Sequence, residues 1–105
     1  MISPNITYIN DMAFKNMFKL KSLVWGSKCP VIPTSCFENC VELEKLILPK
    51  YITSIQANAF YNANIKEIEY QGTVKEWYDN VKLQLAWNNN SQIVNIKCID
   101  GDIEI

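Results

Sequence analysis

The chemistry open to this chain is limited first by what it lacks, because it has no histidine and all ten of its basic residues are lysine. Without an imidazole, it has neither the usual general base nor the His ligand of metal sites. Without arginine, it has no bidentate phosphate clamp and no arginine contact to guanine. Eleven acidic residues bring the net charge to −1, so the basic surface of a nucleic-acid-binding protein is missing. We therefore expect no nucleic-acid partner.

Four cysteines are the residues best suited to a metal site or to disulfides. Cys36 and Cys40 have the i, i+4 spacing of one helix face, and Cys29 and Cys98 could supply two more thiolates. However, Cys36 and Cys40 stand at positions that hold alanine or methionine in the repeats described below, where free cysteine serves as a small apolar side chain. We expect four reduced core thiols and no metal. If the protein is exported, a bridge from Cys29 to Cys36 or Cys40 is the only one we consider.

The carboxylates do not form a catalytic pair. Glu42 and Glu44 alternate with apolar residues, as do Glu67 and Glu69, which is typical of the exposed side of a strand or bend. The sequence has neither a calcium-binding loop nor a glycine-rich phosphate loop. We therefore expect no catalytic residue and no cofactor.

An internal repeat supplies the elements that position these side chains. Phe14, Phe37 and Phe60 are 23 residues apart. Four further columns of small or apolar residues keep this period: Ile6, Cys29 and Ile52; Ile9, Ile32 and Ile55; Ala13, Cys36 and Ala59; Met17, Cys40 and Ala63. The length is that of one domain, so we expect a single domain over 1–105, with three repeats in 6–70 and a C-terminal cap in 71–105.

The second half of each repeat predicts a strand. The spacing L-x-x-L-x-L or its equivalent recurs three times, as Leu20-x-x-Leu23-x-Trp25, Leu43-x-x-Leu46-x-Leu48 and Ile65-x-x-Ile68-x-Tyr70. Residues 22–25, 45–48 and 67–70 should be parallel strands with alternate residues pointing inward. The phenylalanine columns should lie on return arms formed by short helices and pack behind the sheet.

At this point the sequence resembles a known family. Ile32-Pro-Thr-Ser-Cys-Phe-Glu-Asn-Cys-Val-Glu-Leu-Glu-Lys-Leu-Ile-Leu-Pro49 and Ile52-Thr-Ser-Ile-Gln-Ala-Asn-Ala-Phe60 look like the leucine-rich repeats of bacterial surface antigens of the BspA-like class. Tyr70-Gln-Gly-Thr-Val-Lys-Glu-Trp77 and Cys98-Ile-Asp-Gly101 resemble the segment that often closes such arrays. The resemblance implies an α/β leucine-rich-repeat solenoid, and its motifs are specific for fold but weak for function.

Residues 71–105 look built to cover the apolar end of the stack. Thr73-Val-Lys-Glu76 is a capping box that predicts a helix over 74–81, with Trp77 and Val81 on its covering face. Leu83, Leu85 and Trp87 add apolar surface.

The last residues predict a fourth strand and a hairpin. Val94, Ile96 and Cys98 alternate inward, and Asp100-Gly101 is a type I′ turn signal that would pair 96–99 with 102–105. The N-terminal end has no comparable cap beyond its first six residues, which indicates truncation, a partner or self-association there.

The remaining candidate site is the outward face of the strands, where partners of repeat proteins usually bind. Its eight positions form two columns: Ser22, Lys45, Glu67 and Asn95; Val24, Ile47, Glu69 and Lys97. The plainer interpretation is that Lys45 with Glu67, and Glu69 with Lys97, are ordinary cross-strand pairs worth a few tenths of a kcal/mol each. The exposed Val24–Ile47 pair is the part that looks adhesive.

These observations favour a non-enzymatic module that binds another protein. One alternative is a small intracellular or phage-encoded protein that inhibits a host or defence enzyme, or a virion component. The other is the terminal piece of a bacterial surface adhesin. We find no secretory signal and no stretch long enough to span a membrane, so the sequence as written indicates a cytoplasmic protein, and a cell-surface location if it is a fragment of an exported one.

Overall fold

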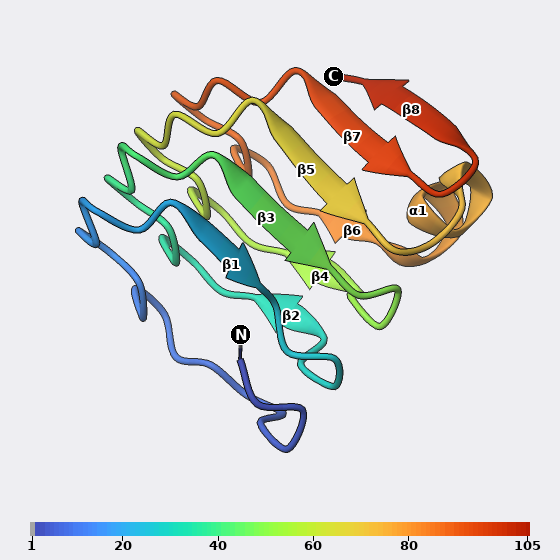
Figure 1. Cartoon of the computed structure of the whole chain (residues 1–105), viewed down its shortest axis with the longest axis horizontal. Coiled ribbons are helices and arrows are strands. Elements are labelled where there is room, and N and C mark those ends of the chain that lie inside the picture. The colour runs from blue at the N-terminus through green and yellow to red at the C-terminus, as the bar shows by residue number, and fades with distance from the viewer. Residues whose placement is uncertain (1) are drawn as a thin grey trace.

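The computed structural model describes residues 2–105 and contains two sheets that run along the molecule (Figure 1). The larger sheet has the order β1–β3–β5–β7–β8, with β1 at Ser22–Val24, β3 at Lys45–Leu48, β5 at Glu67–Tyr70, β7 at Asn95–Cys98 and β8 at Gly101–Glu104. The smaller sheet has the order β2–β4–β6, with β2 at Val31–Ile32, β4 at Ser54–Ile55 and β6 at Lys82–Leu83. The helix α1, Val74–Asn80, lies between β5 and β6 in the chain.

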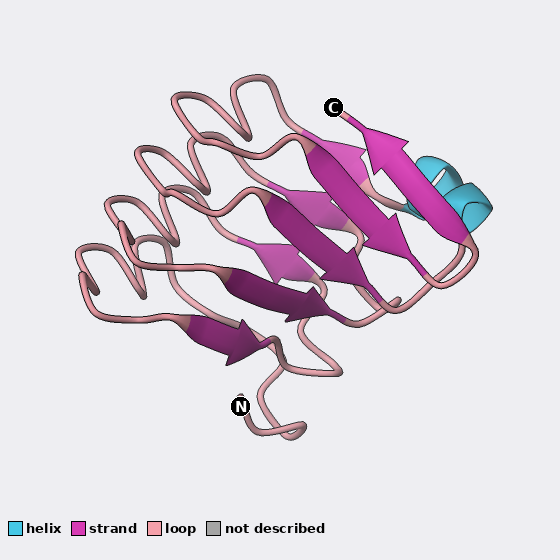
Figure 2. Ribbon diagram, turned by 45° about the horizontal axis from the view of Figure 1, so that its top comes forward, coloured by secondary structure: helices cyan, strands magenta, loops and turns pink. Residues whose placement is uncertain are grey.

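Successive coils of the chain stack so that equivalent strands pair in parallel (Figure 2). Ser22 lies opposite Lys45, and Leu46 lies opposite Ile68, so the offset falls from 23 to 22 residues between the second and third coils. The three predicted strands are confirmed, and their inward residues Leu46 and Ile68 are fully buried. The α/β repeat fold implied by the sequence is therefore present.

The prediction of a short helix on each return arm is wrong. Residues 34–39 and 57–62 form turns, and β2 and β4 supply a second sheet behind the first. Ser35 and Asn39 have φ values of 55° and 62°. A right-handed helix needs negative φ at every residue, so two left-handed residues within one arm prevent it.

The residues with positive φ other than glycine fall into two columns within the described chain. One column is Met12, Ser35, Asn58 and Ala86, and the other is Asn16, Asn39, Asn62 and Asn90. The second column is all asparagine, the residue type that most readily accepts left-handed backbone after glycine. Its side chains also bond across the coils: Asn39 Nδ2 donates to Asn16 Oδ1 at 2.8 Å, and Asn62 Nδ2 donates to Asn39 Oδ1 at 2.9 Å. We call these three residues the asparagine ladder.

The core is filled by the repeat columns. Phe14 stacks on Phe37 with ring centroids 5.5 Å apart, and Phe37 stacks on Phe60 at 5.4 Å, in both cases with nearly parallel planes. Main-chain bonds hold the same spacing, because Phe14 N donates to Cys36 O and Phe37 N donates to Ala59 O. Aromatic stacking and backbone pairing thus set one common distance between coils.

The capping box at α1 is confirmed. Thr73 Oγ1 accepts from the Glu76 backbone N, and Glu76 Oε1 accepts from the Thr73 backbone N, each at 3.0 Å. Asp100 adds a third partner, since its Oδ1 accepts from Val74 N at 2.9 Å. Trp77 and Val81 are buried, in agreement with the sequence.

The hairpin forms with a different turn from the one predicted. Cys98 pairs with Gly101, so Ile99 and Asp100 are the two turn residues rather than Asp100 and Gly101. A type I′ turn requires positive φ at both turn residues, and neither has it. The contact of Asp100 with α1 explains the shift. Val94, expected to point inward, precedes β7 and is 58% exposed.

Residues 82–98 continue the stack as a fourth coil after α1. Ser54 pairs with Lys82 and Glu67 pairs with Asn95, so both sheets keep one offset of 28 residues. Trp87 takes the column of Ala59 and packs edge-on against Phe60 at 6.2 Å. Trp87 is buried as expected, whereas Leu85 is 93% exposed and contributes nothing to the core.

The asparagine ladder yields a prediction. Asn39→Ala should lower the free energy of unfolding by about 1–3 kcal/mol, because alanine tolerates left-handed backbone poorly and makes neither ladder bond. Asn39→Gly should cost less, since glycine removes only the side-chain bonds. Urea denaturation followed by circular dichroism measures both.

Asn10→Ala is the matched control for this measurement, because Asn10 is exposed and has ordinary backbone. Equal unfolding midpoints for Asn39→Ala and Asn10→Ala would contradict a stabilising role for the ladder.

Candidate interaction surface

The outward side chains of the larger sheet form one continuous surface, which we call the sheet face. Parallel register aligns Val24 with Ile47, Ile47 with Glu69, and Glu69 with Lys97. The other column aligns in the same way. The sheet face as predicted consists of Ser22, Val24, Lys45, Ile47, Glu67, Glu69, Asn95 and Lys97, all partly or fully exposed.

Polar contacts on the sheet face differ from the expected cross-strand pairs. Lys45 Nζ lies 3.6 Å from Glu69 Oε1, a diagonal contact rather than one to Glu67 directly opposite. Glu67 Oε2 instead accepts from Asn95 Nδ2 at 2.7 Å. Exposed ion pairs contribute only about 0–1 kcal/mol. These groups are therefore free to exchange their contacts for those of a partner at little cost in stability.

Two members of the sheet face were missed by sequence reasoning. Asp102 lies opposite Lys97, and Glu104 lies opposite Asn95, because β8 pairs antiparallel with β7. Both are exposed, while Ile103 between them is buried. The alternation Asp-Ile-Glu was the available signal, because the predicted register differs from the observed one by two residues and leaves both carboxylates on the outward side.

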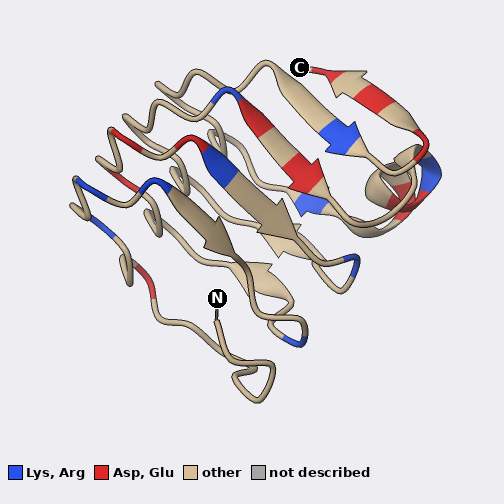
Figure 3. Cartoon of the chain, in the orientation of Figure 1, with Lys and Arg blue, Asp and Glu red and all other residues tan. Residues whose placement is uncertain are grey.

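The sheet face changes in character from one end to the other (Figure 3). Val24 and Ile47, on β1 and β3, form its apolar part. Carboxylates lie on β5, as Glu67 and Glu69, and on β8, as Asp102 and Glu104, with Lys97 of β7 between the two strands. Such a surface can bind an apolar group and a cationic group side by side.

The thiols lie away from the sheet face, in the core. All four are free and buried. Cys40 Sγ lies 3.1 Å from Phe14 O, and Cys29 Sγ lies 3.8 Å from Val31 O. Burial raises the pKa of each thiol, and the neighbouring carboxylates Asp100 and Asp102 add to the shift at Cys98. These are packing groups, as expected from the columns that they occupy.

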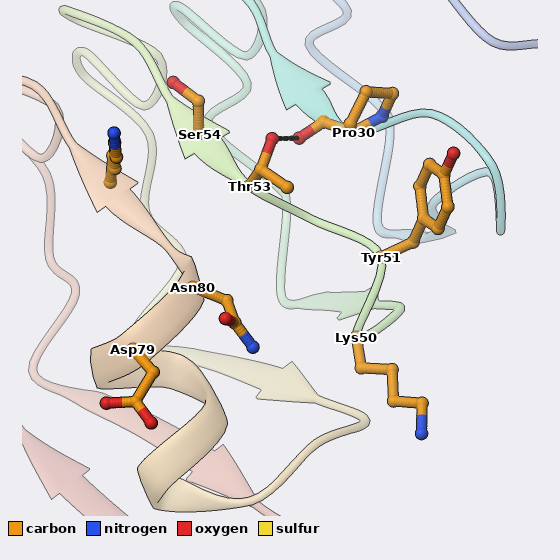
Figure 4. A pocket seen from close by; sticks show the side chains of 8 residues that line it. Pro30, Lys50, Tyr51, Thr53, Ser54, Asp79 and Asn80 are labelled. Carbon is orange, nitrogen blue, oxygen red and sulfur yellow. Dashed lines mark hydrogen bonds between the residues drawn. The ribbon is translucent and has the colours of Figure 1, made fainter.

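Within residues 2–105, no group of three or more Cys, Asp or Glu side chains is arranged to hold a metal ion. No helix in the described chain has the length and apolar character that a membrane span requires. Among the surface hollows, one of about 730 Å³ borders α1 (Figure 4).

The stacked coils, the phenylalanine column and the strand spacing now allow the chain to be compared with known proteins. The family described as BspA type leucine rich repeat region (6 copies) matches residues 1–98. The chain belongs to this family. Searches among curated proteins and among solved structures each found no match. The BspA-type match includes the fourth coil, and leucine-rich repeats of this kind indicate a protein-interaction module.

The buried thiols give a prediction for this BspA-type repeat. In the folded protein at about pH 8, Ellman's reagent should react slowly, because burial raises the pKa values and hides the sulfur atoms. Cys98, the most exposed of the four at 7%, should react first. All four should react at once in denaturant.

The same pKa shifts have a consequence for stability. Unfolded thiols ionise near their ordinary pKa while the folded ones stay protonated, so the free energy of unfolding should fall as pH rises above about 8.5. Rapid labelling of all four thiols in the folded protein would contradict this account.

Proposed function

We propose that this chain is a non-enzymatic protein-binding module that recognises its partner through the sheet face. The observation that carries the proposal is the alignment of outward side chains on hydrogen-bonded strands, with the apolar pair of β1 and β3 beside the carboxylates of β5. Strands held in register lose little conformational entropy on binding, because their backbone is already ordered.

The side chains of the sheet face indicate which groups a partner should present. Val24 and Ile47 can bury an apolar side chain. Glu67, Asp102 and Glu104 can accept charge-assisted hydrogen bonds from lysine or arginine. The partner should therefore present an apolar group next to basic residues, and the association rate should fall as salt is added.

Catalysis is not part of the proposal. Burial raises the pKa of the thiols, which makes them poor nucleophiles. The carboxylates of the sheet face are exposed, and no cofactor is proposed. We therefore propose that the side chains of the sheet face bind a partner and catalyse no reaction.

We also infer that the coils form a solenoid whose C-terminal end is closed by Trp87, α1 and the hairpin. Trp87 supports this inference, since it packs a large side chain over Phe60 where earlier coils hold a small residue. Tyr70 and Trp77 add an edge-on aromatic contact at 5.1 Å under α1. Ile103 of β8 is buried on the same cluster.

The triple variant V24S/I47S/E69K tests the sheet face. It should abolish capture of the partner in a pull-down from the source organism read by mass spectrometry, because it removes the apolar pair and reverses a charge. All three side chains are at least partly exposed, so the circular dichroism spectrum should not change.

V41S/L85S/E42K is a matched control with the same kinds of substitution at exposed positions outside the sheet face. It should retain the partner. If the triple variant captures the same proteins as the control and the unmodified chain, the sheet face is not the interface.

A second proposal concerns self-association at the N-terminal end. Met12, Met17 and Phe18 of the first coil are 53%, 45% and 56% exposed. Cys40 and Ala63, the residues equivalent to Met17, are buried in later coils, whereas the position of Phe18 stays exposed. Residues 2–28 contain four lysines against Asp11, and the hairpin end carries Asp100, Asp102 and Glu104 against Lys97. We propose that a second copy docks head to tail, with its acidic hairpin against this basic, apolar end.

Sedimentation velocity tests this association. The mean mass should rise above 12.1 kDa with concentration, and the rise should weaken with salt and in M17S/F18S. A single species at the monomer mass under all conditions would contradict it, and an association unaffected by M17S/F18S would place the contact elsewhere.

A further inference from the structure

The regular stack is interrupted at one place, where α1 enters between β5 and β6. The offset between equivalent residues rises there from 23 to 28, as the pairing of Ser54 with Lys82 shows. The extra residues build a short wall beside the smaller sheet. A hollow of about 730 Å³ opens between the end of α1 and the segment Lys50–Thr53 (Figure 4). We call this hollow the α1 cleft.

The walls of the α1 cleft are held by main-chain bonds. Lys82 N donates to Thr53 O at 2.9 Å, and Thr53 N donates to Pro30 O at 2.8 Å. β4 and β6 therefore form a fixed floor, and the capping box fixes the start of α1. The cleft is formed before any ligand arrives, as is usual for small-molecule sites.

The α1 cleft is lined by two lysines and one aspartate, whereas the whole chain has a net charge of −1. Lys50 lies in the loop after β3, and Lys82 lies in β6. Its one acidic residue, Asp79, is already paired with Lys75 Nζ, and this bond raises the pKa of Lys75. Two lysines thus remain to attract an anion.

The other lining groups are neutral and suited to hydroxyl groups. Thr53 and Ser54 bring hydroxyls, and Asn80 brings a carboxamide that can both donate and accept. The Thr53 hydroxyl makes only a long bond of 3.4 Å to Pro30 O. Tyr51 is 53% exposed, and its ring can pack against the C–H groups of a sugar while its hydroxyl stays in water.

We propose that the α1 cleft binds a small hydroxylated anion of the acidic-sugar class. Its hydroxyls would contact Thr53, Ser54 and Asn80. Its carboxylate would be attracted by Lys82 and by Lys50, whose side chain points away from these residues in Figure 4 and would turn towards the ligand. Lysine suits this role because it acts as a point charge without demanding the planar geometry of arginine. The site is separate from the sheet face and does not depend on it.

Amide NMR titration with sodium D-glucuronate tests the proposal, with D-glucose and inorganic phosphate as comparison probes. Glucuronate should shift the amides of Thr53, Ser54 and Lys82 and leave those of β1 and β3 unchanged. Glucose and phosphate should each bind at least about tenfold more weakly, because each lacks one of the two kinds of contact.

The variant K50A/K82A should weaken glucuronate binding by about tenfold or more. The control K19A/K66A removes two exposed lysines elsewhere and should bind as the unmodified chain does. No shift at the cleft with glucuronate, or equal binding by the two variants, would overturn the site. Equal affinity for phosphate and glucuronate would overturn the assignment to acidic sugars.

Discussion

The structure depends on a single constraint, which is that every coil must turn the chain twice through left-handed backbone and still return to the same register. Ser35 and Asn39 make these turns in the second coil, and residues of equivalent position make them in each other coil. The asparagine ladder bonds the second turn of one coil to that of the next at 2.8 and 2.9 Å. A short polar side chain that accepts positive φ and also reaches its neighbour satisfies both requirements at once.

The two sheets and the core follow from that register. Neighbouring strands lie about 4.8 Å apart, and the phenylalanine rings stack at 5.4 and 5.5 Å, so aromatic and main-chain contacts are compatible in every coil. Small side chains such as Cys36 and Ala59 are fully buried beside these rings. The raised pKa values of the buried cysteines follow from this burial.

The sequence predicted the features that follow from the period of inward-facing apolar residues. It did not predict the features that follow from the sign of φ or from contacts between residues far apart in the chain. The strands, the phenylalanine column and the capping box could be predicted because each leaves a local pattern of side-chain types. The return arms were misassigned because the i, i+4 spacing of Cys36 and Cys40 also fits a helix, and apolar spacing carries no information on φ. The recurrence of Asn16, Asn39 and Asn62 was the available signal. The hairpin turn was displaced by a tertiary bond from Val74 N to Asp100.

The same reasoning explains why the candidate sites lie where they do. Eight sheet-face positions follow from the register of the parallel strands, whereas the residues opposite Asp102 and Glu104 became known only from the observed hairpin. The α1 cleft could not be predicted, since it arises between segments that only the fourth coil brings together. The insertion that breaks the period adds α1 as one wall of this hollow. All the positively charged side chains are lysines, which lack the bidentate donor geometry of arginine. The acidic sheet face and the cationic cleft would therefore select ligands by the sign of their charge and by their shape.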